Sequence, residues 1–384
     1  MISHWRRFPG DARDWFDHAE IERGRAYNRP MERLKLVRQV LGLAIIVAFI
    51  AGDVGPKVID KLDLRGWAWN VVAVAVVFTL VEGIVSPWFD AYRELVWDRR
   101  WDLSTQTVRG FVSDQVKGMA LGLVLNAILL VPLWAVIRAT DLWWLWGWAL
   151  FSAFTVLFGL LYPVVIAPIF NTFTPLEEGE LRSRILAVAE RTGLPITGVL
   201  VADASKRSRA GNAYVAGLGR TRRVVVFDTI LDWDPEQIEQ VVAHELGHWK
   251  HAHLRRKLPV LIATQLLMFL VTWTVLRWDW LLDAGDVGSV RDPGAVPIFL
   301  AVFPLGFVFV SLVTTWLSRV DERQADLYAL EVLDDPLAFS ALFRTLAAAN
   351  KADVDPGLTK RLLASHPPIP ERLAMAAAWE AAKG

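Results

Sequence analysis

Cysteine is absent from this 384-residue chain, and histidine is scarce, with seven residues. The absence of cysteine excludes disulfides, cysteine nucleophiles and thiolate metal ligands. Basic and acidic side chains balance at 41 each, so the net charge at pH 7 is zero and nothing in it favours a nucleic-acid partner. We therefore expect no nucleic acid, and any transition metal must be held by histidine and carboxylate side chains.

The sequence also lacks internal repeats and low-complexity tracts. Residues 1–35 are polar and rich in arginine, with no short apolar run that ends in a small-residue cleavage site, so they do not predict a secretory signal. Apolar residues, by contrast, are in excess, at 54% hydrophobic with 19 tryptophans. This content is too high for an ordinary soluble protein of this length.

Six apolar segments have the length, or nearly the length, needed to cross a bilayer. They run over about residues 36–51, 67–87, 116–137, 142–170, 258–277 and 295–317. Pro163 and Pro168 near the end of the fourth segment predict a kink or a tilt there. Glu82 in the second segment is either functional or reaches the interface, and its role stays open. Six buried core helices of a soluble protein are the alternative, but the run lengths favour membrane spans.

Basic residues are distributed unevenly between the connections. They gather in residues 1–35, between the second and third segments, and after the fourth segment, whereas the loop from Asp279 to Asp292 is acidic. Positive charge marks the cytoplasmic side of a membrane protein. The sequence therefore predicts a multi-pass protein of the cell membrane, with both termini and the large polar regions on the cytoplasmic side.

Two polar regions, residues 171–257 and 318–384, together hold about 150 residues, enough for one compact domain. Glu177 to Arg191 has the pattern of an amphipathic helix, and Val199 to Ala202 that of a short strand. Asn212 to Leu218 and Arg222 to Phe227 predict a β-hairpin. We thus expect a membrane domain with four spans over residues 1–170 and an α+β domain over 171–384, interrupted by spans at about 258–277 and 295–317.

The pattern H-E-x-x-H occurs once, at His244, Glu245 and His248. On a helix these histidines project from one face, one turn apart, and can share a tetrahedral zinc ion. Glu245 then flanks the metal and can take a proton from a water molecule. Asp234 before Pro235 and Gln237 predicts the helix start with a capping box. The alternative is a surface helix whose histidines only titrate.

A third ligand decides between these interpretations. A metzincin requires glycine at 251 and histidine at 254, but His251 and Leu254 stand there, so that class is excluded. Glu322 and Asp326, four residues apart after the sixth segment, offer carboxylates on one helical face. One can bind zinc while the other orients a ligand histidine. The alternative is a solvated, charged helix start.

Together these motifs resemble the CAAX prenyl protease type I family of integral-membrane zinc metallopeptidases. The resemblance covers roughly residues 85–384. It rests on H-E-L-G-H, two spans and then E-R-Q-A-D, and on Ile166-Ala167-Pro168-Ile169-Phe170, Lys206-Arg207-Ser208, Asn212-Ala213-Tyr214, Val226-Phe227-Asp228-Thr229 and Ser365-His366-Pro367-Pro368. The six spans counted here are one fewer than in eukaryotic members.

The resemblance implies a multi-pass α-helical membrane protein with a zincin-like α+β metallopeptidase domain of the gluzincin type, H-E-x-x-H followed by E-x-x-x-D. It implies one zinc ion per chain, a catalytic base, and two further residues that support the site. The implied ligands are His244, His248 and Glu322; Glu245 is the base, Asp326 lies behind the ligands, and Arg372 braces the site.

The same resemblance implies how substrate is bound. Asn212 and Ala213 match an edge strand that pairs with the substrate backbone, and His366 matches a histidine near the substrate or the developing oxyanion. For His366 the alternative is a histidine that merely precedes a helix. His251 and His253 are expected to face solvent or to lie next to substrate, and not to bind metal. The implied partners are a peptide or protein substrate, with or without a lipid group, and the lipid bilayer.

Three other functions remain open from the sequence. A transporter or scaffold with a structural zinc site is disfavoured by a glutamate beside the ligands and an open coordination position. A membrane chaperone with decayed catalysis is disfavoured by the intact glutamate between the histidines. Within the enzymes, a membrane-protein quality-control peptidase of the heat-shock type is the alternative to cleavage beside a prenylated cysteine.

Overall fold

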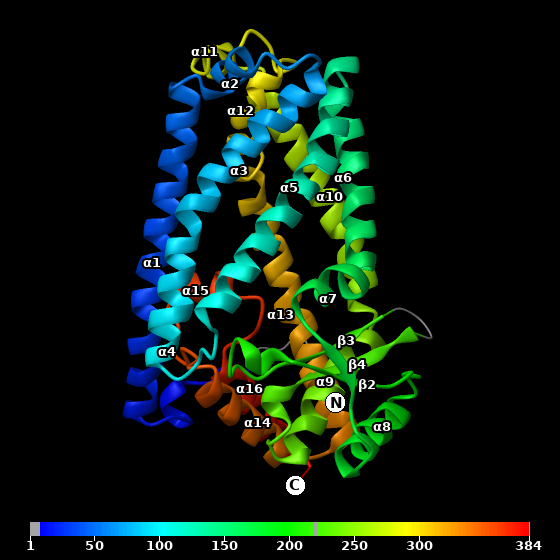
Figure 1. The fold of residues 1–384 in the computed structure, drawn as a ribbon. Coiled ribbons are helices and arrows are strands. Elements are labelled where there is room, and N and C mark those ends of the chain that lie inside the picture. Colours follow the sequence, from blue (N-terminus) through cyan, green and yellow to red (C-terminus); the bar gives the residue numbers. More distant parts are fainter. Residues whose placement is uncertain (1–7, 218–220, 384) are drawn as a thin grey trace.

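The computed structural model describes residues 8–217 and 221–383. Long helices form a bundle, and a smaller domain of helices and strands lies at one end of it (Figure 1). The long helices are α1 (His18–Ala51), α3 (Trp67–Ala91), α5 (Val108–Ala139), α6 (Trp143–Leu161), α10 (His253–Val275) and α13 (Leu305–Leu333). The short helices α2 (Val54–Leu62), α11 (Asp279–Asp283) and α12 (Val296–Val302) lie at or toward the opposite end.

Six helical segments among the described residues are long and apolar enough to cross a membrane, as predicted. The first is much longer than the predicted segment, because the polar sequence before residue 36 continues the same helix. Asp17 begins it with a capping box: its side chain accepts from the backbone N–H of Glu20, whose carboxylate accepts from the N–H of Asp17. Only the second half of α1 is apolar enough for a bilayer.

Two spans are interrupted near prolines. After α6 the chain widens into a π-helical turn, η3 (Tyr162–Ile166), before α7 (Ala167–Phe170), so the regular α-helix ends where a kink or tilt was predicted, near Pro163 and Pro168. Proline lacks a backbone N–H and cannot continue the regular hydrogen bonds. The sixth span is also interrupted, between α12 and α13 at Pro304, which the sequence analysis did not anticipate. Beyond this break α13 runs from the bundle directly into the terminal domain (Figure 1).

The terminal domain contains a four-stranded sheet in the order β1-β2-β4-β3. The strands are β1 (Phe173–Pro175), β2 (Val199–Ala202), β3 (Ala213–Ala216) and β4 (Arg223–Phe227). β1 pairs antiparallel with β2, β2 parallel with β4, and β4 antiparallel with β3. The strand at 199–202 and the hairpin are therefore confirmed, although residues 218–220 of its turn lie outside the described residues. β3 is an edge strand of this sheet.

Five helices complete this domain: α8 (Glu180–Thr192), α9 (Pro235–Lys250), α14 (Pro336–Ala349), α15 (Leu358–Leu363) and α16 (Ile369–Ala381). Its apolar core joins β-strand residues to α8, α9, the last turns of α13, α14 and α16. Phe8, Ala12, Phe16 and Ile21 also pack into this core. The N-terminal segment thus contributes to the terminal domain, although it precedes all the membrane spans.

Helices α9 and α13 approach each other closely at Gly247. A Cβ atom on Gly247 would lie 3.1 Å from the Cα of Ala325 and 3.1 Å from the Tyr328 ring. Contacts this short are tighter than side chains normally make, so the absence of a side chain at Gly247 permits the approach. The glycine of H-E-L-G-H therefore lets the two histidines of α9 face the carboxylates of α13.

Arg207 connects the terminal domain to the bundle. Its Nε donates to Oδ2 of Asp114 on α5 at 2.6 Å, and its Nη1 donates to Oδ1 of Asn171 at 2.9 Å. Because a guanidinium presents several donors in a fixed plane, these contacts hold the domain against α5 and the end of α7 in one orientation.

Candidate metal centre and active site

Helix α9 carries the H-E-x-x-H pattern and begins at Pro235, as predicted. The predicted capping box is wrong. The side chain of Asp234 makes no hydrogen bond to the backbone of the first turn; its Oδ2 accepts from the side-chain Nε2 of Gln237 at 3.1 Å. The two side chains that were expected to cap the backbone bond to each other instead.

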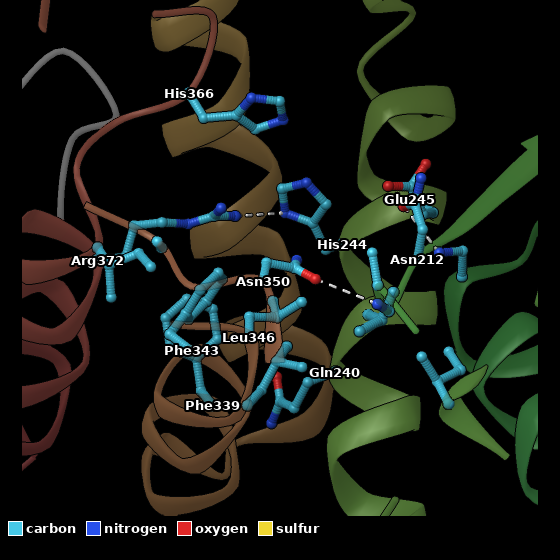
Figure 2. A pocket seen from close by; sticks show the side chains of 18 of the residues that line it. Asn212, Gln240, His244, Glu245, Phe339, Phe343, Leu346, Asn350, His366 and Arg372 are labelled. Atoms are coloured by element: carbon cyan, nitrogen blue, oxygen red, sulfur yellow. Dashed lines mark hydrogen bonds between the residues drawn. The ribbon is translucent and has the colours of Figure 1, made fainter. Parts of the chain in front are cut away.

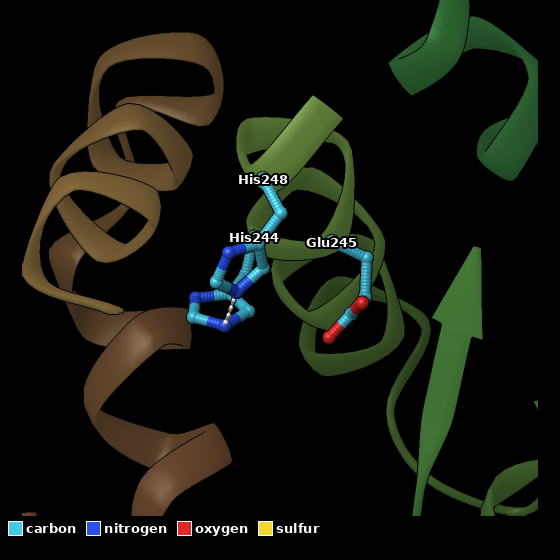
Figure 3. A group of neighbouring side chains, drawn as sticks. All are labelled: His244, Glu245 and His248. Carbon is cyan, nitrogen blue, oxygen red and sulfur yellow. Dashed lines mark hydrogen bonds between the residues drawn. The ribbon is translucent and has the colours of Figure 1, made fainter. Parts of the chain in front are cut away.

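His244, His248 and Glu322 bring two ring nitrogens and one carboxylate group together. His244 Nε2 lies 3.2 Å from His248 Nε2 and 3.3 Å from Oε2 of Glu322, and His248 Nε2 lies 3.4 Å from Oε1 of Glu322. In a tetrahedral zinc site with bonds of about 2.0–2.1 Å, ligand atoms are separated by about 3.3 Å. Figure 3 shows the two imidazoles side by side on α9, with Glu245 beside them.

The chemistry of these three side chains also fits a metal. Oε2 of Glu322 is buried and accepts no hydrogen bond, although a buried carboxylate oxygen normally has a donor. Two imidazoles and one carboxylate match the ligand set of catalytic zinc sites, which leave a fourth position for water or substrate. The residues present therefore fit a zinc ion, with Glu322 as the carboxylate member of the set.

Behind His244 lies a buried ion pair. His244 Nδ1 is 2.9 Å from Oδ1 of Asp326, which is fully buried, and Arg372 Nε donates to Oδ2 of Asp326 at 2.8 Å. The guanidinium of Arg372 stacks 3.8 Å from the ring centre of Phe343. Asp326 and Arg372, which were expected near the ligands, lie 2.9 and 3.4 Å from Nδ1 of His244.

These carboxylates change the protonation of His244 when no metal is bound. Burial acts to lower the pKa of His244, but its interactions with the carboxylates of Asp326 and Glu322 outweigh burial and raise the pKa to about 10. At neutral pH the imidazole of His244 therefore carries an additional proton in the metal-free protein. A metal cation must displace that proton on binding.

His253 has a different position from the one expected. It was expected to face solvent or substrate, but its side chain is buried, and its Nδ1 is 2.8 Å from Nδ1 of His248. The turn at Ala252, where φ is 53°, directs the start of α10 back against α9. His251 is half-buried, and its Nδ1 accepts from the side chain of Gln324 at 3.0 Å. The spacing of the histidines alone could not reveal this reversal of the chain.

Glu245 points into a cavity of about 460 Å³ next to the histidines. Burial raises the pKa of its carboxyl group, and the neighbouring His244 and His248 act in the opposite direction. Figure 2 shows Glu245 and Asn212 on one side of this cavity, and Phe339, Phe343 and Leu346 of α14 on the other. A carboxyl group with a raised pKa at the edge of a cavity is suited to accept and return a proton.

Asn212 and Ala213 lie at the start of the edge strand β3 and both line the cavity. Asn212 is exposed, and its backbone carbonyl accepts from the N–H of Phe227 on β4. The opposite side of β3 carries no further strand of the described sheet. An extended peptide can add to that free edge next to Glu245.

His366 lies in the loop before α16 and reaches the other side of the cavity (Figure 2). Its side chain is 60% exposed, and its Nε2 is 3.4 Å from Oε2 of Glu322. Ser365 Oγ lies 2.8 Å from its Nδ1. Six of the nine residues singled out from the sequence thus line one cavity, and the other three, His248, Glu322 and Asp326, contact the His244 imidazole.

The described chain combines a bundle of membrane-length helices with a metal-ligating cluster on an H-E-x-x-H helix. Comparison with known proteins identifies a membrane protease in both the helical bundle and the terminal domain. Residues 1–172 match the family described as CAAX prenyl protease N-terminal, five membrane helices, and residues 175–380 match peptidase family M48. The protein is an integral-membrane metalloprotease, and the chain belongs to peptidase family M48.

Individual proteins are similar over most of this chain. CAAX prenyl protease 1 homolog of Arabidopsis thaliana is 32% identical over 297 residues, 74% of this chain and 68% of that protein. CAAX prenyl protease 1 of Saccharomyces cerevisiae is 28% identical over 406 residues, 96% of this chain and 88% of that protein. Uncharacterized metalloprotease YhfN of Bacillus subtilis is 31% identical over 278 residues, 71% of this chain and 65% of that protein.

Among solved structures, S. mikatae Ste24p has the same fold, with a TM-score of 0.85, and the match covers 97% of this chain and 94% of that one at 22% identity. The resemblance to the CAAX prenyl protease type I family is therefore confirmed. One difference concerns the N-terminal part: the family description gives five membrane helices, whereas the described residues up to 172 contain four of membrane length. The nine-residue α2 is too short to be a fifth.

Proposed function

We propose that this chain is a zinc endopeptidase that cleaves peptide bonds close to the membrane surface. The observation that carries the proposal is the triangle of His244 Nε2, His248 Nε2 and the Glu322 carboxylate, with separations of 3.2–3.4 Å, next to Glu245 and a free strand edge. In this proposal His244, His248 and Glu322 hold one zinc ion per chain. A structural zinc site in a transporter or scaffold would have no need of a buried carboxyl group beside the ligands and a free strand edge.

When bound, zinc supplies Lewis acidity to a water molecule and to the scissile carbonyl group. Glu245 accepts the proton of the attacking water and passes it to the leaving amine, a role that suits its buried carboxyl group. His366 donates a hydrogen bond to the carbonyl oxygen as negative charge develops. The edge of β3 at Asn212 and Ala213 holds the substrate backbone as an added strand.

Asp326 and Arg372 act through His244. Asp326 accepts from His244 Nδ1, which keeps the lone pair of Nε2 directed at the metal. Arg372 balances the charge of Asp326 and lies 3.9 Å from Oε2 of Glu322. The two residues therefore orient one ligand without binding the metal themselves.

We further propose that substrates are peptides whose C-terminal region carries a prenyl group. Several similar proteins, in plants, yeast and animals, are named CAAX prenyl proteases, and the cavity beside Glu245 lies at the end of a membrane-length helical bundle. A lipid-modified C-terminus is held at the bilayer and presents its last residues at the water side. Quality-control cleavage of unmodified membrane proteins is the competing function.

The purified full-length protein, loaded with zinc, tests this proposal. It is incubated with a peptide that ends in a prenylated cysteine followed by three residues, and with the same peptide without the lipid. Products are identified by mass spectrometry, and Glu245→Gln is the matched control. The expected result is release of the last three residues from the prenylated peptide by the parent protein alone.

Two results would contradict parts of the proposal. Equal cleavage of both peptides would show that the prenyl group is not needed for substrate recognition. This result would favour quality-control proteolysis. Absence of cleavage of any peptide or membrane-protein substrate by a protein that binds zinc would favour a structural site. Residual cleavage by Glu245→Gln equal to that of the parent would show that another group is the base.

A further inference from the structure

His248 has a buried neighbour that no motif assigned to the metal site. Its Nε2 faces His244 and Glu322, while its other ring nitrogen, Nδ1, is 2.8 Å from Nδ1 of His253. Only 2% of His253 is exposed, so water cannot replace this contact. Which of the two Nδ1 atoms carries the hydrogen determines whether Nε2 of His248 is free to bind a metal.

Arg256 fixes the direction of the hydrogen bonds around His253. A guanidinium group can only donate, and Arg256 Nη1 is 3.0 Å from Oε1 of Gln324. This contact places the amide oxygen of Gln324 toward Arg256. The NH₂ group of Gln324 then faces His251 and donates to its Nδ1 at 3.0 Å. The orientation of the Gln324 amide is therefore set by its partners.

The same oxygen also determines the tautomer of His253. His253 Nε2 is 3.0 Å from Oε1 of Gln324, and two groups facing one acceptor oxygen must both be donors. His253 thus carries its hydrogen on Nε2, and in the neutral imidazole Nδ1 is left as an acceptor. His248 Nδ1 must then be the donor, so Nε2 of His248 holds a lone pair directed at the metal site.

Charged groups around His253 support the neutral form. Asp321 Oδ1 lies 3.7 Å from His253 Nε2, but Lys257 Nζ is 3.2 Å and Arg256 Nη2 is 3.7 Å from the same carboxylate. The two cations offset the single anion, so the surroundings do not require a positive charge on His253. Of the groups that the structure places near the ring, only the Gln324 oxygen is within hydrogen-bond distance of Nε2.

We propose that His253 is a positioning residue, which fixes the tautomer and ring orientation of His248 for metal binding. Arg256 fixes the orientation of the Gln324 amide, and the amide oxygen of Gln324 in turn fixes the tautomer of His253. The two ligand histidines are then held by different means, His244 by the carboxylate of Asp326 and His248 by a neutral imidazole. The proposal rests on the zinc site of the proposed function.

Three substitutions in the full chain separate hydrogen bonding from packing. In His253→Asn the side-chain oxygen takes the place of Nδ1 and can still accept from His248, whereas His253→Leu keeps an apolar volume and accepts nothing. His251→Leu is the matched control, since it removes a histidine that accepts from Gln324 and stacks on His253 while leaving the His248–His253 contact in place. Zinc affinity is measured by competition with a chromophoric chelator, and the visible spectrum of the Co²⁺-substituted protein reports ligand geometry.

The expected result is a loss of zinc affinity of about 10–100-fold in His253→Leu, the usual range for the partner of a ligand histidine. The Co²⁺ spectrum should change in the same variant. His253→Asn should stay within about threefold of the parent, and His251→Leu should match it. An equal loss in the asparagine and leucine variants, or affinity in His253→Leu equal to that of the parent, would overturn the proposal.

A second variant covers the case in which His253→Leu does not fold. Gln324→Met removes the acceptor that fixes His253 yet does not touch a ligand, and it should weaken zinc binding less than His253→Leu but more than His251→Leu. Unchanged affinity in Gln324→Met would also count against the proposal. If the parent protein binds no zinc, the proposed function fails. If the parent binds zinc and the His253→Leu and Gln324→Met variants bind it with the same affinity, only the role of His253 is contradicted.

Discussion

Arg372 and Asp326 form a two-point ion pair behind the candidate metal ligands. Nε of Arg372 donates to Oδ2 of Asp326 at 2.8 Å, and a terminal nitrogen of the same guanidinium donates to Oδ1. Both side chains are buried, and the aspartate comes from α13 while the arginine comes from α16. The C-terminal helix is thereby tied to the carboxylate that orients His244.

Removing the arginine should therefore destabilise the metal-free protein. In Arg372→Met the buried carboxylates of Asp326 and Glu322 keep only the protonated His244 as a cation, and loss of one partner of a buried pair costs about 3–5 kcal/mol. Arg184→Met is the control, because Arg184 pairs with Glu236 and Glu239 at the surface, where ion pairs contribute at most about 1 kcal/mol. Thermal unfolding of both variants without zinc gives the comparison; equal melting temperatures would contradict the prediction.

Substitutions at the two carboxylates of α13 should separate metal binding from orientation. Glu322→Ala removes a ligand, so bound zinc should be lost, whereas Asp326→Ala should lower affinity by about 10–100-fold. Glu245→Gln should keep its zinc, because the carboxyl group of Glu245 is assigned to proton transfer. Elemental analysis and chelator competition on the purified variants measure these effects. Full zinc content in Glu322→Ala would remove this residue from the ligand set.

Zinc affinity should depend strongly on pH. The pKa of His244 in the metal-free protein is raised to about 10, so zinc must displace a proton at any lower pH. Apparent affinity should rise about tenfold per pH unit between about pH 6.5 and 9, with release of a proton for each zinc bound. Chelator competition at several pH values and proton release in weak buffer measure this slope. A flat profile would show that His244 is not protonated before zinc binds.

The raised pKa of His244 also affects the stability of the metal-free protein. This stability should fall as the pH rises, whereas the zinc affinity should increase. A group whose pKa is higher in the folded than in the unfolded state stabilises the fold below the unfolded value, near 6.5 for histidine, and this contribution disappears as the pH rises through about 10. The increase in melting temperature on addition of zinc should therefore grow with pH. An increase that is constant from pH 6.5 to 9 would contradict this linkage.

The orientation of the protein in the membrane can be tested because the chain has no cysteine. Glu177 lies in the terminal domain, and Asp283 lies in the acidic loop at the opposite end of the bundle; both are exposed. The distribution of basic residues predicts that Glu177 lies on the cytoplasmic side. In intact cells a membrane-impermeant thiol reagent should label Asp283→Cys but not Glu177→Cys. Labelling of Glu177→Cys alone would reverse the orientation.

Features that depend on local sequence were predictable. The membrane-length helices follow from long apolar runs, and the histidines of α9 share a face because helical periodicity fixes their directions. The edge strand β3 and its hairpin partner also follow from strand propensity and turn residues. These elements are determined mainly by residues within about one helical turn or one hairpin.

Features that depend on contacts between distant segments were not predictable. His253 is buried because the chain reverses at Ala252 and packs the start of α10 against α9, a result of tertiary packing. Phe8 and Phe16 enter the core of the terminal domain although four spans separate them from it in the sequence. The close approach at Gly247 likewise appears only when α13 lies against α9. Helical periodicity identifies the residues that share one face of a helix. It does not identify the element that packs against that face.

The interruption of the terminal domain by α10, α12 and α13 has a consequence for the order of synthesis. His244 and His248 are translated before the fifth span, and Glu322 after the sixth, yet the three side chains meet at one position. Two membrane crossings lie between them, so the ligands share a compartment only when both have been completed. A chain that stalls with one of these helices uninserted cannot assemble the metal-binding triangle. With the proposed ligand set, proteolytic activity is therefore expected only after both crossings have been completed.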